Sequence, residues 1–217
     1  MKSAVIFDLD GTLADTLEDI ADSMNHVLVD CGFPSHAYES YRFFVGNGLK
    51  NLVTQCLPEQ ARTAPIIDKC YNLMISNYNL NYTNKTRLYE GVSELLDALA
   101  LNGIKKAILS NKTDLLTQKI CSALLHKWNF EAIIGYSERF PRKPNPASAL
   151  FIAKEMGIEP QKICYLGDSD VDMNTATAAG FYPIGVAWGF RPVEELLKNG
   201  AKQIIEHPME LMRLSFL

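Results

Sequence analysis

Two aspartates, Asp8 and Asp10, follow a short apolar run at the start of the chain. Because side chains alternate along an extended backbone, both carboxylates are expected on one side, with Leu9 turned away. Two carboxylates this close repel each other, unless a cation or a shared proton lies between them. One aspartate could cap a helix while the other is solvated, but the pair favours a chemical role. Gly11 then permits a turn that a residue with a Cβ would resist.

A second acidic group lies far along the chain, in the sequence GDSDVD at residues 167–172. Gly167 allows a close backbone approach, Asp168 follows an apolar run, and Asp172 lies one helical turn further on. Carboxylate oxygens suit Mg²⁺, which takes six oxygen ligands at about 2.1 Å and keeps several waters. Asp170 competes with Asp172 for a supporting role at such a site, and the residue types leave that choice open.

Two further segments could hold a phosphate group. Ser110 offers a hydroxyl, and the backbone N–H groups of 111–112 follow it at the expected start of a helix, which suits a phosphate oxygen. Serine is also a common helix N-cap, so this segment is weak by itself. Lys143 lies in the sequence RKPNP, where the prolines stiffen the loop. A lysine held there can neutralise both a phosphate and a carboxylate, although most loop lysines are only solvated.

Five short apolar runs are expected to be the strands that position these groups. They are too uniformly apolar for half-exposed strands, which favours burial on both faces. The runs cover residues 4–7, 107–109, 132–134, 163–166 and 183–186. Helical patterns separate them, and two of these patterns end at Gly103 and Gly157, as C-terminal caps commonly do.

Strands that alternate with helices imply right-handed crossovers. They predict an α/β fold with a Rossmann-like parallel sheet and helices on both faces. Ligands of such sheets bind beyond the carboxyl ends of the strands. The two acidic groups, Ser110 and Lys143 are therefore expected to meet at that edge of the sheet.

One long stretch, from about residue 15 to residue 82, has helical periodicity and no convincing strand. Four helices are expected there, with Thr16 and Asp19 forming a capping box at the first and Gly32 ending it. The predicted segments run from Leu17 to Gly32 and over about 37–45, 49–57 and 62–81. They predict a small all-helical domain over residues 15–84, inserted into an α/β core formed by residues 1–14 and 85–217. The connections are expected at residues 11–15 and 84–90.

The composition excludes several classes of protein. The chain has 217 residues, 47% hydrophobic and 21% charged, with a net charge of -4, so no overall basic field would attract nucleic acid or anionic lipid. No apolar run approaches the roughly 18 residues of a membrane span, and the N-terminus lacks the pattern of a signal peptide. The five cysteines contain no CxxC pair, which predicts buried free thiols. The four histidines are scattered, which disfavours zinc. A cytoplasmic protein is expected, without nucleic-acid or membrane partners.

Taken in order, these segments resemble the motifs of the haloacid dehalogenase-like hydrolase superfamily. DLDGTLADT at 8–16 is similar to its first motif, LSNK at 109–112 to its second, RKPNP to its third and GDSDVD to its fourth. The resemblance covers essentially the whole chain, because the helical insertion lies where one type of cap is placed in that family. Finer features, at residues 46–48, 89–92 and 186–191, are similar to the phosphoglycolate phosphatase-like branch. That branch usually has proline where Glu90 stands.

The resemblance implies that Asp8 is a nucleophile that forms an aspartyl phosphate. It implies a Mg²⁺ ion held by the Asp8 carboxylate, the Asp10 backbone carbonyl and the Asp168 carboxylate, with Asp172 supporting from outside this ligand set. Asp10 would protonate the leaving alcohol and later accept a proton from water. The residues implied at the substrate phosphate are Thr12, Ser110, Asn111 and Lys143, and Lys143 is also implied in catalysis.

The implied function is hydrolysis of a small phosphomonoester similar to phosphoglycolate, and the size and charge of the chain fit a monomer or weak homodimer. A mutase of the β-phosphoglucomutase kind would share every core motif and is the first alternative. A dehalogenase is disfavoured because halide needs no proton from Asp10, and a non-catalytic phosphate-binding module is disfavoured because it would not need Asp10. Arg42, Asn47 and Lys50 of the expected cap are candidates to contact the rest of the substrate.

Overall fold

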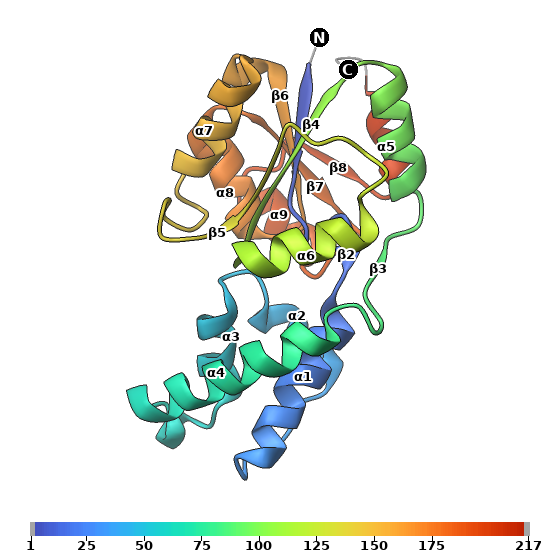
Figure 1. Cartoon of the computed structure of the whole chain (residues 1–217). Coiled ribbons are helices and arrows are strands. Elements are labelled where there is room, and N and C mark those ends of the chain that lie inside the picture. Colours follow the sequence, from blue (N-terminus) through green and yellow to red (C-terminus); the bar gives the residue numbers. More distant parts are fainter. Residues whose placement is uncertain (1–2, 215–217) are drawn as a thin grey trace.

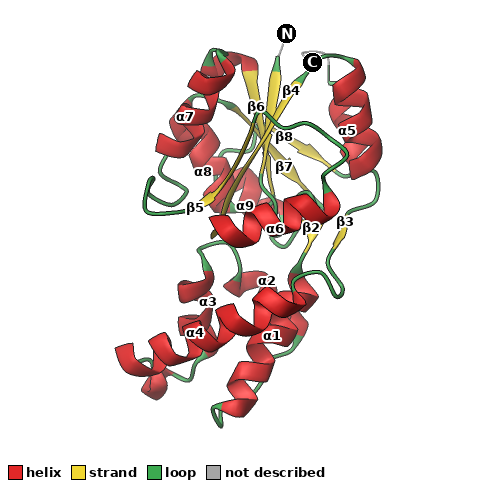
Figure 2. Cartoon of the chain, in the orientation of Figure 1, coloured by secondary structure: helices red, strands yellow, loops and turns green. Residues whose placement is uncertain are grey.

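A computed structural model describes residues 3–214, in which a six-stranded parallel sheet forms the centre of the larger part (Figures 1 and 2). The strand order is β5-β4-β1-β6-β7-β8. The strands are β1 (Ala4–Phe7), β4 (Lys105–Thr113), β5 (Ala132–Tyr136), β6 (Ile163–Gly167), β7 (Tyr182–Val186) and β8 (Gln203–Ile205). β1 pairs in parallel with β4 on one side and β6 on the other, which places the N-terminal strand in the middle of the sheet.

Helices cover both faces of this sheet, as predicted. They are α5 (Val92–Leu101), α6 (Asp114–Leu124), α7 (Ala147–Met156), α8 (Asp170–Ala179) and α9 (Val193–Lys198). Alternate residues of β1 enter opposite layers. Val5 and Phe7 belong to the core that includes α5 and α6, whereas Ala4 and Ile6 belong to the core of α7 and α8. Burial on both faces explains why β1 reads as an unbroken apolar run.

The five predicted strands all occur, but the predicted end of the second strand is wrong. β4 continues to Thr113, so Ser110, Asn111 and Lys112 lie in a strand and not at the start of a helix. α6 begins only at Asp114. The register between β4 and β5 shifts between Leu109 and Thr113, which lets the strand continue through these polar, buried residues. Alternation of apolar residues gives no sign of this extension, because the extended part is polar.

Four helices form the predicted cap, which lies beyond the carboxyl ends of the strands (Figure 1). They are α1 (Leu17–Asp30), α2 (Tyr38–Phe44), α3 (Leu49–Cys56) and α4 (Ala64–Asn81), and a 3-10 turn (Glu59–Ala61) lies between the last two. The cap helices share a hydrophobic cluster centred on Met24, Tyr41, Leu52, Met74 and Tyr78, and two residues from outside the cap, Leu116 and Phe190, complete it. Gly32 follows the end of α1 with a φ of 76°, in agreement with the predicted cap glycine.

The two connections between cap and core run side by side. β2 (Ala14–Asp15) and β3 (Arg87–Leu88) pair as a short antiparallel ribbon that the sequence did not predict. The whole insertion therefore leaves the core and returns to it through one pair of strands.

The capping box predicted at Thr16 and Asp19 is wrong. Thr16 makes no side-chain cap, and its hydroxyl donates instead to Asp10 Oδ1 at 2.6 Å. Asp19 accepts hydrogen bonds from the backbone N–H of Lys85, and from the N–H and hydroxyl of Thr86 at 2.8 and 2.7 Å. Thr16 and Asp19 are both buried, and each finds a partner outside the helix end, Thr16 at Asp10 and Asp19 at the connection that returns from the cap.

None of the five cysteines, all within residues 3–214, forms a disulfide, and four of them are buried. Among the helices of that range, none combines the length and the apolar character that crossing a bilayer requires.

Candidate active site

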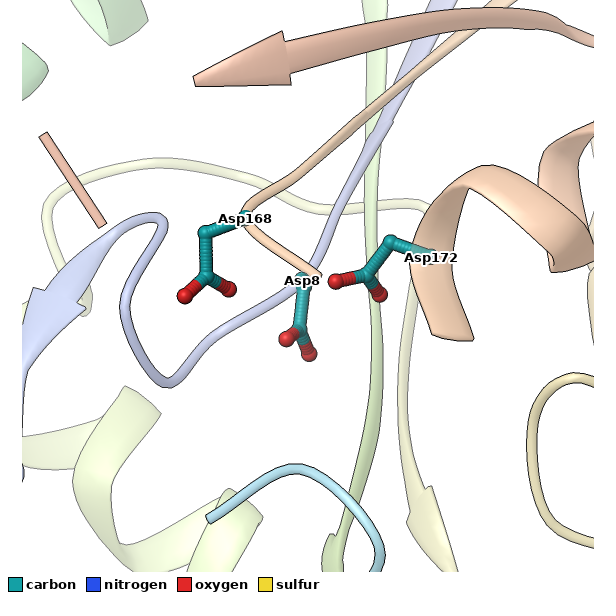
Figure 3. Close-up of side chains that lie close together, drawn as sticks. All are labelled: Asp8, Asp168 and Asp172. Atoms are coloured by element: carbon teal, nitrogen blue, oxygen red, sulfur yellow. The ribbon is translucent and has the colours of Figure 1, made fainter. Parts of the chain in front are cut away.

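Three carboxylates meet at the carboxyl ends of the central strands. Asp8 directly follows β1, Asp168 directly follows β6, and Asp172 lies in the first turn of α8. One oxygen of each lies within 4.8 Å of the others, and the three side chains face a common space (Figure 3). The backbone N–H of Asp8 donates to Leu166 O at 2.9 Å, so the ends of the two strands are joined beside the cluster. The sequence prediction that these aspartates lie together is confirmed in position.

Lys143 is the cation of this cluster. Its Nζ lies 2.9 Å from Asp8 Oδ1 and 2.7 Å from Asp172 Oδ1, and it also donates to Leu109 O and to the hydroxyl of Tyr165, both at 3.1 Å. All of these partners are buried, so the ammonium group has one fixed position.

Asn111 holds the loop that carries Lys143. Its side-chain oxygen accepts from Lys143 N at 2.9 Å, and its amide donates to Lys143 O and to Gly46 O of the cap, both at 3.0 Å. The Asn111 side chain therefore joins β4, the lysine loop and the cap. Its expected contact with a substrate phosphate stays a prediction.

Asp172 supports the cluster from the helix. Its Oδ1 binds Lys143, and its Oδ2 accepts from the backbone N–H of Ser169 at 3.1 Å and from the Ser169 hydroxyl at 2.6 Å, in a capping box for α8. Asp170, the competing residue, is not in the carboxylate cluster and lines a surface groove beside α9 with Glu194. The geometry thus favours Asp172 over Asp170.

The charges of this cluster are unbalanced. Burial and the neighbouring carboxylate of Asp172 raise the pKa of Asp8 to about 7, although Lys143 opposes this shift. Burial, with Asp172 and Asp8 nearby, also raises the pKa of Asp168 well above its usual range. Burial opposes the charge of Lys143, but the carboxylates of Asp172 and Asp8 raise its pKa well above its usual value. One lysine thus faces three buried carboxylates, an arrangement that favours the binding of a further cation.

Two glycines leave the space that Asp168 occupies. A Cβ on Gly189 would lie 2.1 Å from Asp168 Cβ, and a Cβ on Gly11 would lie 2.3 Å from Asp168 Oδ2. Asp168 Oδ2 accepts from the backbone N–H of Phe190 at 2.8 Å, and the Thr12 hydroxyl lies 3.4 Å from Asp168 Oδ1. Thr12 thus contacts a candidate metal ligand, and its expected contact with a substrate phosphate stays a prediction.

Asp10 lies beside this cluster and not within it. Its Oδ1 accepts from Thr16 and pairs with Lys112 Nζ at 3.0 Å, and Lys112 also donates to the hydroxyl of Tyr78 on α4 at 2.9 Å. Sequence reasoning missed both Lys112 and Tyr78. The position of Lys112 two residues after Ser110 was a possible signal, whereas Tyr78 sits in an ordinary apolar helix pattern.

A pocket between cap and core opens onto Asp8, Asp10, Ser110 and Asp168. Its cap side is mainly apolar, with Ile20, Val45, Leu49 and Leu52 beside the backbone of Gly46 and Gly48. Of the cap residues expected to contact substrate, none lines this pocket. Arg42 donates to Gly189 O at 3.3 Å, Asn47 lines the surface groove of Asp170, and Lys50 pairs with Asp68 on the exposed surface at 2.7 Å.

Arg191 fixes the cap over the pocket from the core side. Its guanidinium donates to the carbonyl oxygens of Arg42, Phe43 and Val45 at the end of α2, the last two at 3.1 Å. These are carbonyls that a helix end leaves without partners of its own.

The parallel sheet, the acidic cluster at its carboxyl edge and the helical insertion after β1 define a class of α/β enzymes with a lid over an acidic site. The chain belongs to the haloacid dehalogenase-like hydrolase family, whose model matches residues 5–186, and the resemblance found in the sequence is thereby confirmed.

Similar proteins agree with this assignment. The phosphoglycolate phosphatase of Pseudomonas putida is 31% identical over 88% of this chain and 72% of its own length. That of Agrobacterium fabrum is 32% identical over 89% of this chain and 84% of its own. The crystal structure of a predicted phosphoglycolate phosphatase from Haemophilus somnus superposes with a TM-score of 0.92 at 27% identity, over 99% of this chain and 98% of that one.

Proposed function

We propose that this chain is a Mg²⁺-dependent phosphatase that hydrolyses a small phosphomonoester through an aspartyl phosphate on Asp8. The observation that carries the proposal is the position of Asp8, which lies 2.9 Å from Lys143 in a cluster of buried carboxylates at the floor of a capped pocket. The named relatives make phosphoglycolate the first substrate to test.

The residues present fit a divalent cation. Oxygen donors surround the space between Asp8 and Asp168. Burial, together with the neighbouring carboxylates, raises the pKa of both carboxyl groups, so a cation between them would favour their charged forms. Carboxylate donors without histidine or cysteine suit Mg²⁺ better than zinc. Asp8, Asp168 and the backbone carbonyl of Asp10 would hold the ion. When bound, it would polarise the phosphoryl group and reduce its repulsion of Asp8. Asp172 would stay outside the ligand set, because both of its oxygens already have partners.

In the first step, a carboxylate oxygen of Asp8 forms a bond to phosphorus while the bond from phosphorus to the ester oxygen breaks. Asp10 gives its proton to that ester oxygen, so the product leaves as a neutral alcohol. Lys143 remains beside Asp8 and balances negative charge on the transferring group, and Ser110 faces the same pocket.

In the second step, water attacks the aspartyl phosphate. Asp10 takes a proton from the water, the water oxygen bonds to phosphorus, and the bond from phosphorus to Asp8 breaks. Inorganic phosphate leaves, and both aspartates return to their starting state. A seated cap limits this step to the few water molecules that the pocket admits.

The test is phosphate release from a panel of small phosphomonoesters, with phosphoglycolate included, in Mg²⁺ and in EDTA. We expect release in Mg²⁺ from the wild type, none in EDTA and none from Asp8→Asn. Asp68→Asn is the matched control, since Asp68 is exposed and pairs only with Lys50 across the surface of the cap. Release that survives in Asp8→Asn would overturn the assignment of the nucleophile.

The same panel separates the alternatives. A sugar phosphate converted to its isomer without free phosphate would identify a mutase, which shares the core motifs. Binding of phosphate without turnover of any compound would indicate a binding module. Either result would replace the proposed function.

A further inference from the structure

Lys112 is a buried lysine shared between the core and the cap. Its Nζ lies 3.0 Å from Asp10 Oδ1 and 2.9 Å from the hydroxyl of Tyr78, and it lies 4.6 Å from the centre of the Tyr78 ring. Lys112 is 5% exposed and Tyr78 is fully buried. Lys112 comes from β4 of the sheet, whereas Tyr78 comes from α4 of the cap. A single ammonium group therefore contacts both Asp10 and the lid.

The hydrogen bonds of Asp10 fall on one oxygen. Thr16 and Lys112 both contact Oδ1, at 2.6 and 3.0 Å, and no side chain or backbone group within residues 3–214 donates to Oδ2. Asp10 lines the pocket. With Oδ1 anchored, Oδ2 is the oxygen that can exchange a proton with a group in the pocket.

The energetic cost of burying Lys112 also indicates that Asp10 and Tyr78 hold its ammonium group in place. Removing an ammonium group from water is unfavourable unless a counter-charge and hydrogen bonds replace the lost hydration. Asp10 supplies the charge, and Tyr78 supplies an acceptor and the negative face of its ring. Two of the three N–H donors of the ammonium group are thereby used inside the protein.

We propose that Lys112 is a positioning residue that aims Oδ2 of Asp10 at the reacting oxygen, and that Tyr78 holds Lys112 in place when the cap is seated. The inference rests on the proposed function, because it concerns proton transfer by Asp10 in phosphoryl transfer. Lys112 also lines the pocket, and the role given to it here is exerted through Asp10 and not through a contact with the substrate. The position of the proton-transferring carboxylate then depends on a residue of the lid.

The test compares two small phosphates with different needs for a proton. The first is the alkyl phosphate of the panel with the highest kcat/KM, whose leaving group is an alkoxide that requires a proton. The second is acetyl phosphate, whose leaving group is acetate, a stable carboxylate. Lys112→Met removes the ammonium group and keeps the length of the side chain. Lys106→Met is the matched control, because Lys106 lies on the same strand, is also buried and does not line the pocket.

We expect Lys112→Met to lower kcat/KM for the alkyl phosphate by about 10-fold or more relative to acetyl phosphate, with KM changed less than kcat. Lys106→Met should leave this ratio unchanged. An equal loss of kcat/KM for both phosphates would overturn the proposal in favour of a structural role. A rise in KM with kcat retained would overturn it in favour of a substrate-binding role. A wild type that releases phosphate from neither compound would overturn the proposed function and this inference with it.

Tyr78→Phe provides a second variant in case Lys112→Met does not fold, since it removes only one hydroxyl. It should lower the same ratio in the same direction by a smaller factor. In the Lys112→Met background it should have no further effect on the ratio, because its action passes through Lys112. Independent, additive effects of the two substitutions would overturn the role given to Tyr78.

Discussion

Asp172 uses both of its carboxylate oxygens on groups of the protein, one on Lys143 and the other on Ser169. The capping box at α8 and the ion pair at the cluster are thus properties of the same side chain. A change there would loosen Lys143, and with it the charge balance at Asp8, without removing a proposed metal ligand.

Asp172→Asn should therefore lower kcat by about 10-fold to 100-fold, the usual effect of losing an outer support of a metal site. Half-maximal activation by Mg²⁺ should shift less than it does for Asp168→Asn. Steady-state rates over a Mg²⁺ titration measure both quantities. Asp170→Asn is the control, and the reverse result, with Asp170 needed and Asp172 dispensable, would contradict the role assigned to Asp172.

Gly189→Ala is the residue-scale test of how tightly Asp168 is enclosed. A Cβ there would lie 2.1 Å from Asp168 Cβ and 2.7 Å from Gly11 O, so Asp168 must move. We expect a loss of about 1–3 kcal/mol in the free energy of unfolding, as for other overpacked sites, together with a weaker response to Mg²⁺.

Gly103→Ala serves as the control for Gly189→Ala. Gly103 has a positive φ but open space around its Cα, so alanine strains the backbone far from the site. Denaturant unfolding should show a lower free energy of unfolding for both variants. Only Gly189→Ala should change the dependence of activity on Mg²⁺. An equal Mg²⁺ response in both would contradict the tight enclosure of Asp168.

Sequence reasoning located Asp8 and Asp168 because each immediately follows a strand. Asp8 and Asp168 follow uniformly apolar strands, and the rule that such ends meet was enough to bring them together. Lys112 and Tyr78 could not be found in this way. Their contact joins a strand of the core to a helix of the cap, and no local pattern encodes how the two pack.

At the scale of elements, the connections to the cap are where local patterns were most misleading. Asp19 has the spacing of a capping residue, but it binds the returning connection at Lys85 and Thr86, where the buried Thr86 needs an acceptor. β2 and β3 have two residues each, too short to give an alternating pattern. The four helices of the cap, in contrast, were all predicted.

Asp19→Asn tests this joint. An amide accepts fewer hydrogen bonds than a carboxylate, so one or more of the donors of Lys85 and Thr86 should lose its partner. We expect the free energy of unfolding to fall by about 1–3 kcal/mol. Limited proteolysis should cut faster within residues 82–90. Asp22→Asn on the same helix is the control, because Asp22 binds side chains and not the backbone of the connection. Unchanged cutting in Asp19→Asn would show that the joint does not depend on this carboxylate.

At the scale of the whole molecule, the acidic cluster should make stability depend on Mg²⁺. An ion that binds only the folded chain stabilises it by about 2.7 kcal/mol when its concentration is 100 times its Kd. For a chain of this size, each kcal/mol of stabilisation raises Tm by about 2–4 °C. Thermal unfolding in Mg²⁺ and in EDTA measures the difference.

Asp168→Asn should remove the Mg²⁺-dependent rise in Tm. It should also raise Tm in EDTA, since it replaces a carboxyl group whose ionisation is made unfavourable by burial and by the carboxylates of Asp172 and Asp8. Asp68→Asn on the cap surface should leave both values near those of the wild type. A full Mg²⁺ response in Asp168→Asn would place the ion elsewhere.

The central position of β1 has a consequence for how the chain is made. β1 is synthesised first, yet its neighbours β4 and β6 are translated only about 100 and 160 residues later. The complete set of cap helices leaves the ribosome in between, with most of their hydrophobic cluster, while β1 is still without its partner strands. The sheet can close around β1 only when β6 has emerged, so the most apolar strand of the nascent chain is the one that needs protection longest.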